Sequence, residues 1–180
     1  MYKVHLPKTD LNIYSKDLVE KYSKYWENIN IELLRDEKNK NQPNFILHDG
    51  PPYANGSIHI GHAENKFYKD VLNKYHWNTG HNTPYIMGWD SHGLPIENAV
   101  EKELIKDGID KKTLTRQEFW DKCYDFSKNW MEKQKEQFKR LGVFSKNDQS
   151  YFISNDEESI GVIDCIHHFV EKDYILQKFT

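Results

Sequence analysis

Two histidines and the loop before them are the residues of this chain best suited to chemistry. His59 and His62 follow a short apolar run at residues 45–47. The loop between that run and the histidines is rich in turn-forming residues, namely Gly50, Pro51, Pro52, Asn55 and Gly56. A strand, a loop and a helix N-terminus in this order bind anions, because unpaired backbone N–H groups and the positive helix end point outward. Imidazole N–H groups can also donate to phosphate oxygens. The pattern therefore predicts a phosphate site.

The second candidate is Asp90, which closely follows another apolar run at residues 85–87. Open α/β sheets bind ligands at the carboxyl ends of their strands, so a carboxylate there can hold a polar group of a substrate. In isolation, an aspartate at such a position is more often a turn residue or the N-cap of a helix.

The histidines also allow other interpretations. The pair could belong to a polar turn, and the dipeptide Asn55-Gly56 alone is typical of a hairpin. A metal site would recruit His48 or His92 as a further ligand. The HxxH spacing, however, lacks the i, i+4 arrangement and the glutamate of the zinc-binding HExxH pattern. We therefore expect no protein-bound metal in this segment.

The elements around these residues form a predicted strand–helix–strand unit between residues 45 and 90. Its helix opens at Gly61 and ends before Gly80. One face of this helix is apolar, and we expect it to be buried through Phe67, Tyr68, Val71, Leu72 and Tyr75. Two strands joined in this way are parallel, with a right-handed crossover.

The same periodicity predicts four further helices. The N-terminal one carries Leu18, Val19, Tyr22, Trp26 and Ile29. A second begins at Pro95 and has as its buried stripe Ile96, Ala99, Val100 and Leu104. A third is capped by Thr115 and Glu118 and stops at Gly142, with an apolar stripe of Phe119, Cys123, Phe126, Trp130 and Phe138. The last is capped by Asn155 with Glu158 and directs inward Ile160, Ile163, Ile166 and Val170.

Composition narrows the class of protein. The 180 residues suffice for one domain with an extension. A net charge of −3 gives no general case for nucleic-acid binding, so any such contact has to be local. Cys123 and Cys165 lack CxxC spacing and occupy apolar helical positions, which predicts two reduced core cysteines. No apolar run has the length of a signal peptide or a membrane span, so we expect a cytoplasmic protein without membrane contact.

Two longer strings resemble a known family. Residues 59–62 read HIGH, the signature of class I aminoacyl-tRNA synthetases, and residues 48–56 read HDGPPYANG, as in the isoleucyl branch. Residues 88–97, GWDSHGLPIE, resemble the isoleucyl motif GWDxHGLPIE. The resemblance implies an α/β fold. Residues 44–180 would be the first half of a Rossmann-like catalytic domain, with parallel strands and crossover helices, running to the start of the connective insertion. Residues 1–43 would be an N-terminal helical extension and linker.

The resemblance also implies a reaction and its residues. This family joins an amino acid to ATP and then to tRNA; here it implies isoleucine, ATP with Mg²⁺ and tRNA(Ile), in a monomeric parent protein. His59 and His62 would be catalytic and contact the phosphates, and adenine would lie against Gly61. The ATP site would comprise His59, Gly61, His62, Tyr53, Asn55 and Gly56. Asp90 would pair with the α-ammonium group. The amino-acid site would comprise Pro51, Pro52, Asp90, Trp89 and His92, of which Trp89 and His92 could instead be packing.

Other parts of the family pattern are missing from these 180 residues. No KMSKS-like loop is found, and residues 141–147 lack the acidic–Trp pair that members carry after their Leu-Gly turn. We therefore expect a fragment of a synthetase of the isoleucyl branch, inactive on its own. Two alternatives remain open: a non-catalytic synthetase-like module that binds ATP, an amino acid or a partner, and a class I synthetase for valine, leucine or methionine.

Overall fold

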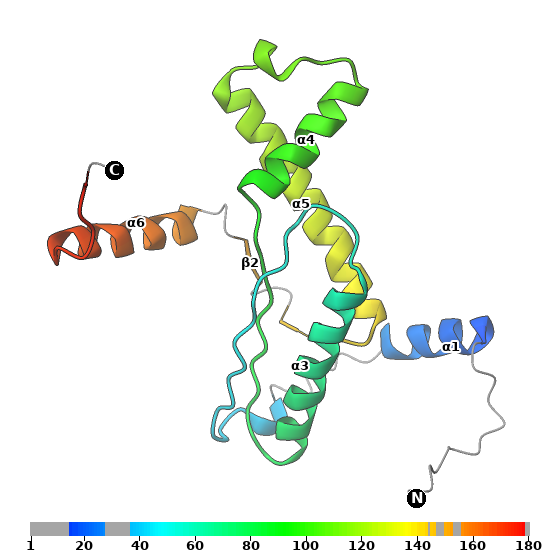
Figure 1. The fold of residues 1–180 in the computed structure, drawn as a ribbon. Helices are drawn as coiled ribbons and strands as arrows, with labels where there is room; N and C mark the ends of the chain where they lie inside the picture. Colours follow the sequence, from blue (N-terminus) through cyan, green and yellow to red (C-terminus); the bar gives the residue numbers. More distant parts are fainter. Residues whose placement is uncertain (1–14, 28–36, 144, 147–149, 153–155, 179–180) are drawn as a thin grey trace, which may run out of the picture. The chain divides into compact units, whose positions relative to one another are not determined.

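The computed structural model describes residues 15–27, 37–143, 145–146, 150–152 and 156–178. The chain divides into two compact units, Met1–Ile31 and Glu32–Thr180. Helix α1 (Lys16–Glu27) of the first unit lies where the sequence predicts a helix, although Ile29 of its expected stripe is outside the described residues. All other elements belong to the second unit (Figure 1).

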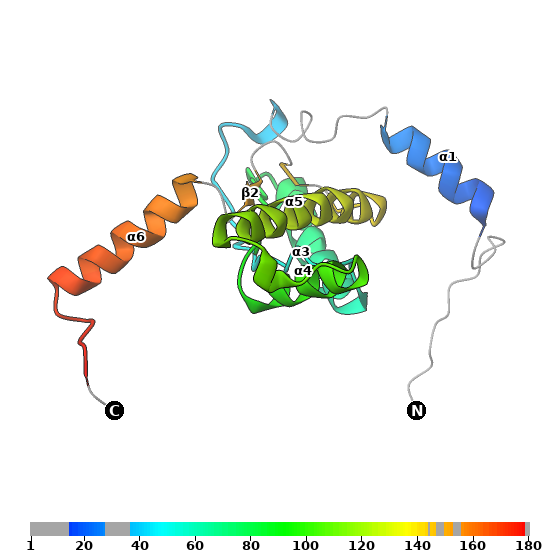
Figure 2. The ribbon, with the colours of Figure 1, turned by 90° about the horizontal axis from the view of Figure 1, so that it is seen from above.

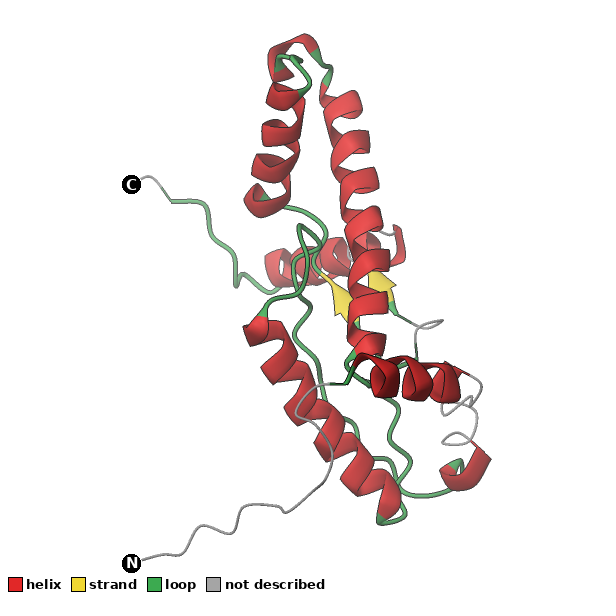
Figure 3. Cartoon of the chain, turned by 90° about the vertical axis from the view of Figure 1, so that its right-hand side faces the viewer, coloured by secondary structure: helices red, strands yellow, loops and turns green. Residues whose placement is uncertain are grey.

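Two extended segments of the second unit are joined by helix α3 (Ile60–Asn78). They pair in parallel at two bridges, Asn44 with Asn82 and Tyr53 with Asp90. The expected strands at residues 45–47 and 85–87 do not form between these bridges, and Figure 3 draws both segments there as loop.

The spacing of the bridges explains the missing strands. From 44 to 53 is nine residues, but from 82 to 90 is only eight, so no single register can join the two bridges. Proline adds to this, because residues without an N–H cannot donate to a ladder, and the two segments contain Pro43, Pro51, Pro52 and Pro84.

A short parallel sheet begins where the second segment ends. Strand β1 (Gly88–Trp89) pairs with β2 (Tyr151–Phe152). Glycine at residue 88 leaves room for the Tyr151 ring, because a Cβ there would lie 1.9 Å from Cζ of that ring and would displace it. The second segment thus forms a strand only at its end, directly after residues 85–87, and this strand pairs with β2 and not with the predicted partner at residues 45–47.

Helices α4 (Leu94–Lys106) and α5 (Arg116–Arg140) form a hairpin, with the short 3-10 helix η1 (Lys111–Thr113) between them. Figures 1 and 2 show the two helices side by side. Their shared core consists of Ile96, Val100, Leu104 and Cys123, which confirms these members of the predicted stripes. Phe119 and Phe126 pack against it partly buried, and Phe138 belongs to another core cluster. The predicted capping box also forms. The Thr115 hydroxyl accepts from the Glu118 N–H, and the Glu118 carboxylate accepts from the Thr115 N–H.

The C-terminal half of α5 belongs to a second core cluster. Its members come from the loop before α3, from β1 and the extended segment before it, from α5 and the turn after it, and from β2. They are Ala54, Tyr85, Met87, Trp89, Met131, Phe138, Val143 and Phe152. One helix thus supports the two segments that carry the candidate site residues.

The expected buried face of α3 is wrong. Phe67, Tyr68, Val71, Leu72 and Tyr75 are between 45% and 62% exposed, and the buried side chains are instead Lys66, Asp70 and Asn73. The polar face of α3 is the buried one, because Asp49, in the segment before the helix, pairs there with Lys66 and Lys69. Periodicity identified the apolar stripe but not which face the described chain covers.

The inward face predicted for the last helix is also wrong for the described chain. On α6 (Asp156–Glu171) the side chains of Ile160, Ile163, Ile166 and Val170 are all about half exposed or more. An amphipathic helix hides its apolar face only where another element covers it. The expected cap, Asn155, lies outside the described residues.

Only one of the two cysteines is a core residue. Cys123 is buried, whereas Cys165 is exposed on α6, and both are free thiols. Burial raises the pKa of Cys123 to about 11, so it stays protonated and unreactive. No helix in the described part of the chain is both long and apolar enough to cross a bilayer.

Candidate active site

The two histidines form the N-terminal cap of α3. His59 is the N-cap residue, and its Nδ1 accepts from the N–H groups of Gly61 at 3.1 Å and His62 at 3.4 Å. In return, Nδ1 of His62 accepts from the His59 N–H at 3.4 Å. This is a capping box built from imidazoles instead of a hydroxyl and a carboxylate. The rings stack at 3.8 Å.

The cap determines which ring nitrogens can face a ligand. Because Nδ1 of both rings accepts a backbone N–H, a neutral His59 or His62 carries its proton on Nε2. Partial burial lowers the pKa of His62, and the charges of His59 and Lys66 lower it further, so this ring is neutral at pH 7. The helix start therefore presents Nε2–H donors beside its own positive end.

Gly61 leaves room for this arrangement. A Cβ at residue 61 would lie 3.1 Å from Cε1 and 3.2 Å from Nδ1 of the His59 ring. An alanine there would press on the ring that caps the helix. The structure thus supplies a local reason for glycine at this position, beside the adenine contact that the family resemblance implies.

Asp90 lies next to the loop that leads to the histidines. The Asp90 N–H donates to the Pro52 carbonyl at 2.9 Å, and the Ala54 N–H donates to the Asp90 carbonyl at 2.9 Å. Asp90 is half-buried, and its carboxylate accepts at 3.5 Å from the His92 N–H. The N-cap of the following helix is Gly93, so Asp90 is not the cap of α4.

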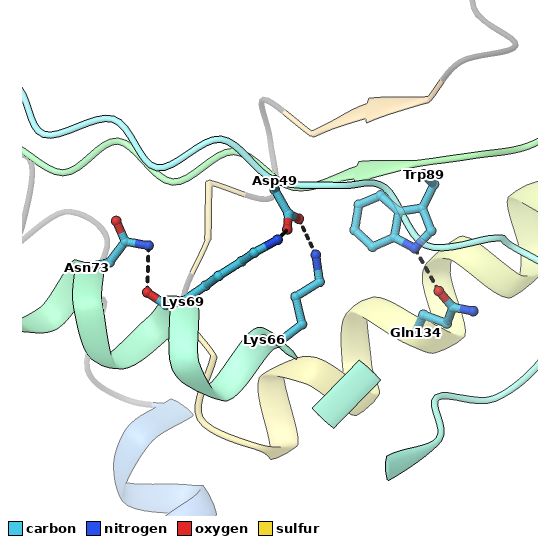
Figure 4. A network of polar contacts seen from close by, with 6 residues as sticks. All are labelled: Asp49, Lys66, Lys69, Asn73, Trp89 and Gln134. Atoms are coloured by element: carbon cyan, nitrogen blue, oxygen red, sulfur yellow. Dashed lines mark hydrogen bonds and ion pairs between the residues drawn. The ribbon is translucent and has the colours of Figure 1, made fainter. Parts of the chain in front are cut away.

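The other predicted site residues differ in accessibility. Pro52 is buried and Pro51 half-buried, whereas Tyr53, Asn55 and His92 are exposed and Gly56 is half-buried. Trp89 is fully buried, and its indole N–H donates to Oε1 of Gln134 at 2.9 Å (Figure 4). Among the residues that the structure describes, no group of three or more His, Cys, Asp and Glu side chains could hold a metal ion.

Sequence reasoning missed the side chains that hold the loop from α5. Gln134 donates from Nε2 to the carbonyls of Tyr53, at 3.0 Å, and Gly56, at 2.7 Å. Gln137 accepts on Oε1 from the Ile58 N–H at 2.9 Å. Position 134 lies three residues after buried Met131 and four before buried Phe138, so the helical period could have placed it on the inner face.

A buried ion cluster was also missed. Asp49, just before the proline loop, pairs with Lys66 and Lys69 on α3, as Figure 4 shows. The side chains of Asp49 and Lys66 are 1% and 2% exposed. Burial lowers the pKa of Lys66, while the Asp49 carboxylate opposes that shift. The cluster ties the loop to the helix that begins at the histidines.

The sequence from residue 21 to residue 180 matches the family described as tRNA synthetases class I (I, L, M and V). The chain therefore belongs to the class I aminoacyl-tRNA synthetases, as residues 59–62 and 88–97 predict. A solved relative, the ternary complex of Agrobacterium radiobacter K84 agnB2 LeuRS with tRNA and LeuAMS, matches with a TM-score of 0.63 at 20% identity. The match covers 86% of this chain and 17% of that one, and it shows the class I catalytic fold.

Similar curated proteins belong to the isoleucyl branch. The isoleucine–tRNA ligase of Caldicellulosiruptor saccharolyticus is 42% identical over 176 residues, 96% of this chain and 19% of that protein. The isoleucine–tRNA ligase of Syntrophomonas wolfei is 49% identical over 140 residues, 77% of this chain and 15% of that protein. The chain thus spans at most about a fifth of the length of these relatives.

Proposed function

We propose that this chain is the part of an isoleucine–tRNA ligase that receives ATP and isoleucine. The observation that carries the proposal is the pairing of Tyr53 with Asp90. In this pairing, the backbone of the loop that runs into the capped histidines is bonded to the backbone of Asp90, the residue that we assign to the amino acid. The identities of 39–49% to isoleucine–tRNA ligases support isoleucine as the amino acid.

In the first step of the reaction, a carboxylate oxygen of isoleucine attacks the α-phosphorus of ATP, and the bond to pyrophosphate breaks. Such phosphoryl chemistry depends mostly on positioning and charge stabilisation. His59 and His62 would donate from Nε2–H to phosphate oxygens as charge develops, beside the positive end of α3. Tyr53, Asn55, Gly56 and Gly61 would line the nucleotide. The isoleucyl group then passes to tRNA(Ile).

The amino acid would lie on the other side of the loop. Asp90 would accept from the α-ammonium group, with Pro51 and Pro52 as rigid walls for the branched side chain. His92, which is exposed, would lie at the edge of that pocket. We assign Trp89 a supporting role from the core, since its side chain is fully buried.

Mg²⁺ would be bound by the phosphates of ATP and would reach the site together with the nucleotide. Mg²⁺ requires oxygen ligands, whereas the start of α3 offers imidazole and backbone N–H donors, which suit phosphate oxygens. Asp49 is already paired with Lys66 and Lys69. The side chains at this site therefore fit the phosphates, and the phosphates would hold the ion.

We extend the proposal to the layout of the parent protein. Residues 1–43 would form a helical extension and linker, and residues 44–180 the first half of a Rossmann-like catalytic domain up to the connective insertion. The parent would act as a cytoplasmic monomer.

Asp90→Asn tests the amino-acid site. In a full-length isoleucine–tRNA ligase that carries this segment, we expect KM for isoleucine to rise at least about tenfold in ATP–pyrophosphate exchange. A charge-assisted hydrogen bond contributes roughly 1.5–3 kcal/mol, and about 1.4 kcal/mol corresponds to tenfold. KM for ATP should change little, because other groups hold the phosphates.

The matched control is Asp107→Asn, the same change at the exposed C-cap of α4. A large loss of thermal stability in Asp90→Asn with an unchanged KM for isoleucine would make Asp90 a structural turn residue. Exchange driven by valine, leucine or methionine in preference to isoleucine would change the assigned amino acid.

Residues 1–180 alone should transfer no measurable isoleucine to tRNA. The chain spans at most about a fifth of its relatives, and the family needs a KMSKS-side loop, absent from these residues, to hold the triphosphate. Transfer of labelled isoleucine to tRNA(Ile) by the purified 180-residue chain measures this. Robust charging would contradict the view that the activity belongs to a longer protein.

A further inference from the structure

Gln134 makes three hydrogen bonds from a position with no solvent exposure. Its Nε2 donates to the carbonyls of Tyr53 and Gly56, at 3.0 and 2.7 Å. Its Oε1 accepts from the indole N–H of Trp89, at 2.9 Å. One amide therefore binds both the loop before the histidines and the residue before Asp90. Figure 4 shows its bond to Trp89.

The chemistry of these partners requires an amide. The Trp89 indole can only donate, so it must face an oxygen, and the two backbone carbonyls can only accept, so they must face the NH₂ group. A glutamate would turn a carboxylate toward two carbonyl oxygens. A methionine of similar length would leave the buried indole N–H unpaired and would release the two part-buried carbonyls.

Gln137 continues the same contact one helical turn further along α5. Its Oε1 accepts from the Ile58 N–H at 2.9 Å, and its Nε2 donates to the Ser57 hydroxyl at 3.2 Å. Gln134 and Gln137, here called the α5 amide pair, therefore contact the loop at residues 53, 56, 57 and 58. The next residue is the N-cap, His59.

We propose that the α5 amide pair positions the two substrate sites relative to each other. The inference rests on the proposed function, because it concerns the loop assigned to ATP and the strand end assigned to isoleucine. We assign neither glutamine to a substrate contact, since their amides are occupied by the loop and by Trp89. The pair instead fixes the backbone of the loop that leads to His59. Through Trp89, it also fixes the residue directly before Asp90. Its loss should therefore disturb the alignment of the carboxylate with the α-phosphorus more than the binding of either substrate.

The test measures isoleucine-dependent ATP–pyrophosphate exchange in a full-length ligase that carries this segment. We expect Gln134→Glu and Gln134→Met each to lower kcat at least about tenfold, since small misplacements of reacting groups have effects of this size. The KM values for ATP and isoleucine should each change by less than about threefold, as befits groups that align bound substrates without holding them. Gln137→Met, a milder change at a half-buried residue, should lower kcat several-fold with the same pattern.

Two control variants separate positioning from stability. Gln117→Met changes the same residue type on the same helix, where the side chain is exposed and bonds to Asp121. Val100→Ala leaves a cavity in the α4–α5 core, in a different cluster from the loop residue Ala54. Both should keep a near-normal kcat when each variant is assayed well below its own melting temperature.

A kcat within twofold of normal in folded Gln134 variants would overturn the proposal. If the Gln134 variants do not fold, Gln137→Met decides by the same criterion. The His62→Ala variant, assayed in parallel, separates the two levels of inference. Loss of exchange in His62→Ala with normal Gln134 and Gln137 variants would reject only the positioning role, whereas normal exchange in His62→Ala would reject the proposed phosphate site itself.

Discussion

His62→Ala is expected to lower isoleucine-dependent pyrophosphate exchange about 10²-fold or more, with a smaller change in KM for isoleucine. Removing one preorganised donor to a developing charge typically has an effect of this size. The position of His62 in the structure is the basis for this prediction. His62 lies in the first turn of α3, its Nδ1 is used by the His59 N–H, and its neutral ring has Nε2–H to offer to phosphate.

The same substitution also removes part of the helix cap, so a matched variant is needed. Glutamine at the third helical position can accept from the N-cap N–H as His62 does, but it offers no ring N–H. We therefore expect His62→Gln to restore thermal stability while leaving exchange low. Recovery of exchange in His62→Gln would show that His62 matters only as a cap.

The position of His59 and His62 at the start of α3 was predictable because a helix start is a local structure. A helix cap depends on residues within one turn, so the spacing of His59 and His62 indicated where α3 begins. Thr115 and Glu118 predicted the start of α5 for the same reason. The reciprocal imidazole bonds were not predicted, because histidine is not a usual capping residue.

The errors concern contacts between segments distant in sequence. The strand prediction failed because the two bridges differ by one residue in spacing, which no single segment reveals. The burial prediction for α3 failed because Asp49, 17 residues before Lys66, draws the polar face inward. Gln134 was overlooked because its partners at residues 53, 56 and 89 are far from it along the chain.

The second large effect is expected from Asp49, which pairs with Lys66 and Lys69 on the buried polar face of α3. Lys66 is 2% exposed beside Asp49 at 1%, and removing one partner of a buried ion pair destabilises a fold by about 3–5 kcal/mol. For Asp49→Asn we therefore expect hydrogen-exchange protection of α3 amides, measured in the full-length ligase, to fall about 10²-fold or more. Exchange of pyrophosphate should fall as well, since α3 carries His62.

The double variant Asp49→Asn with Lys66→Met is the matched control. It removes the buried Lys66 charge together with its partner and leaves only Lys69, whose side chain is 18% exposed and closer to solvent, without the carboxylate. It should therefore regain much of the protection that Asp49→Asn loses.

The pH dependence of the Asp49→Asn variant has a definite sign. Burial already lowers the pKa of Lys66, and without the Asp49 carboxylate nothing in the pair opposes that shift. The folded variant then releases the Lys66 proton at a lower pH than the unfolded chain does. The unfolded state binds more protons across that interval, so stability rises as pH rises through it and is lost as pH falls back through the folded pKa. Protection of α3 in Asp49→Asn, corrected for the intrinsic exchange rate, should therefore recover toward alkaline pH. Protection equal to that of the parent at neutral pH would mean that Asp49 does not hold the polar face of α3 inward.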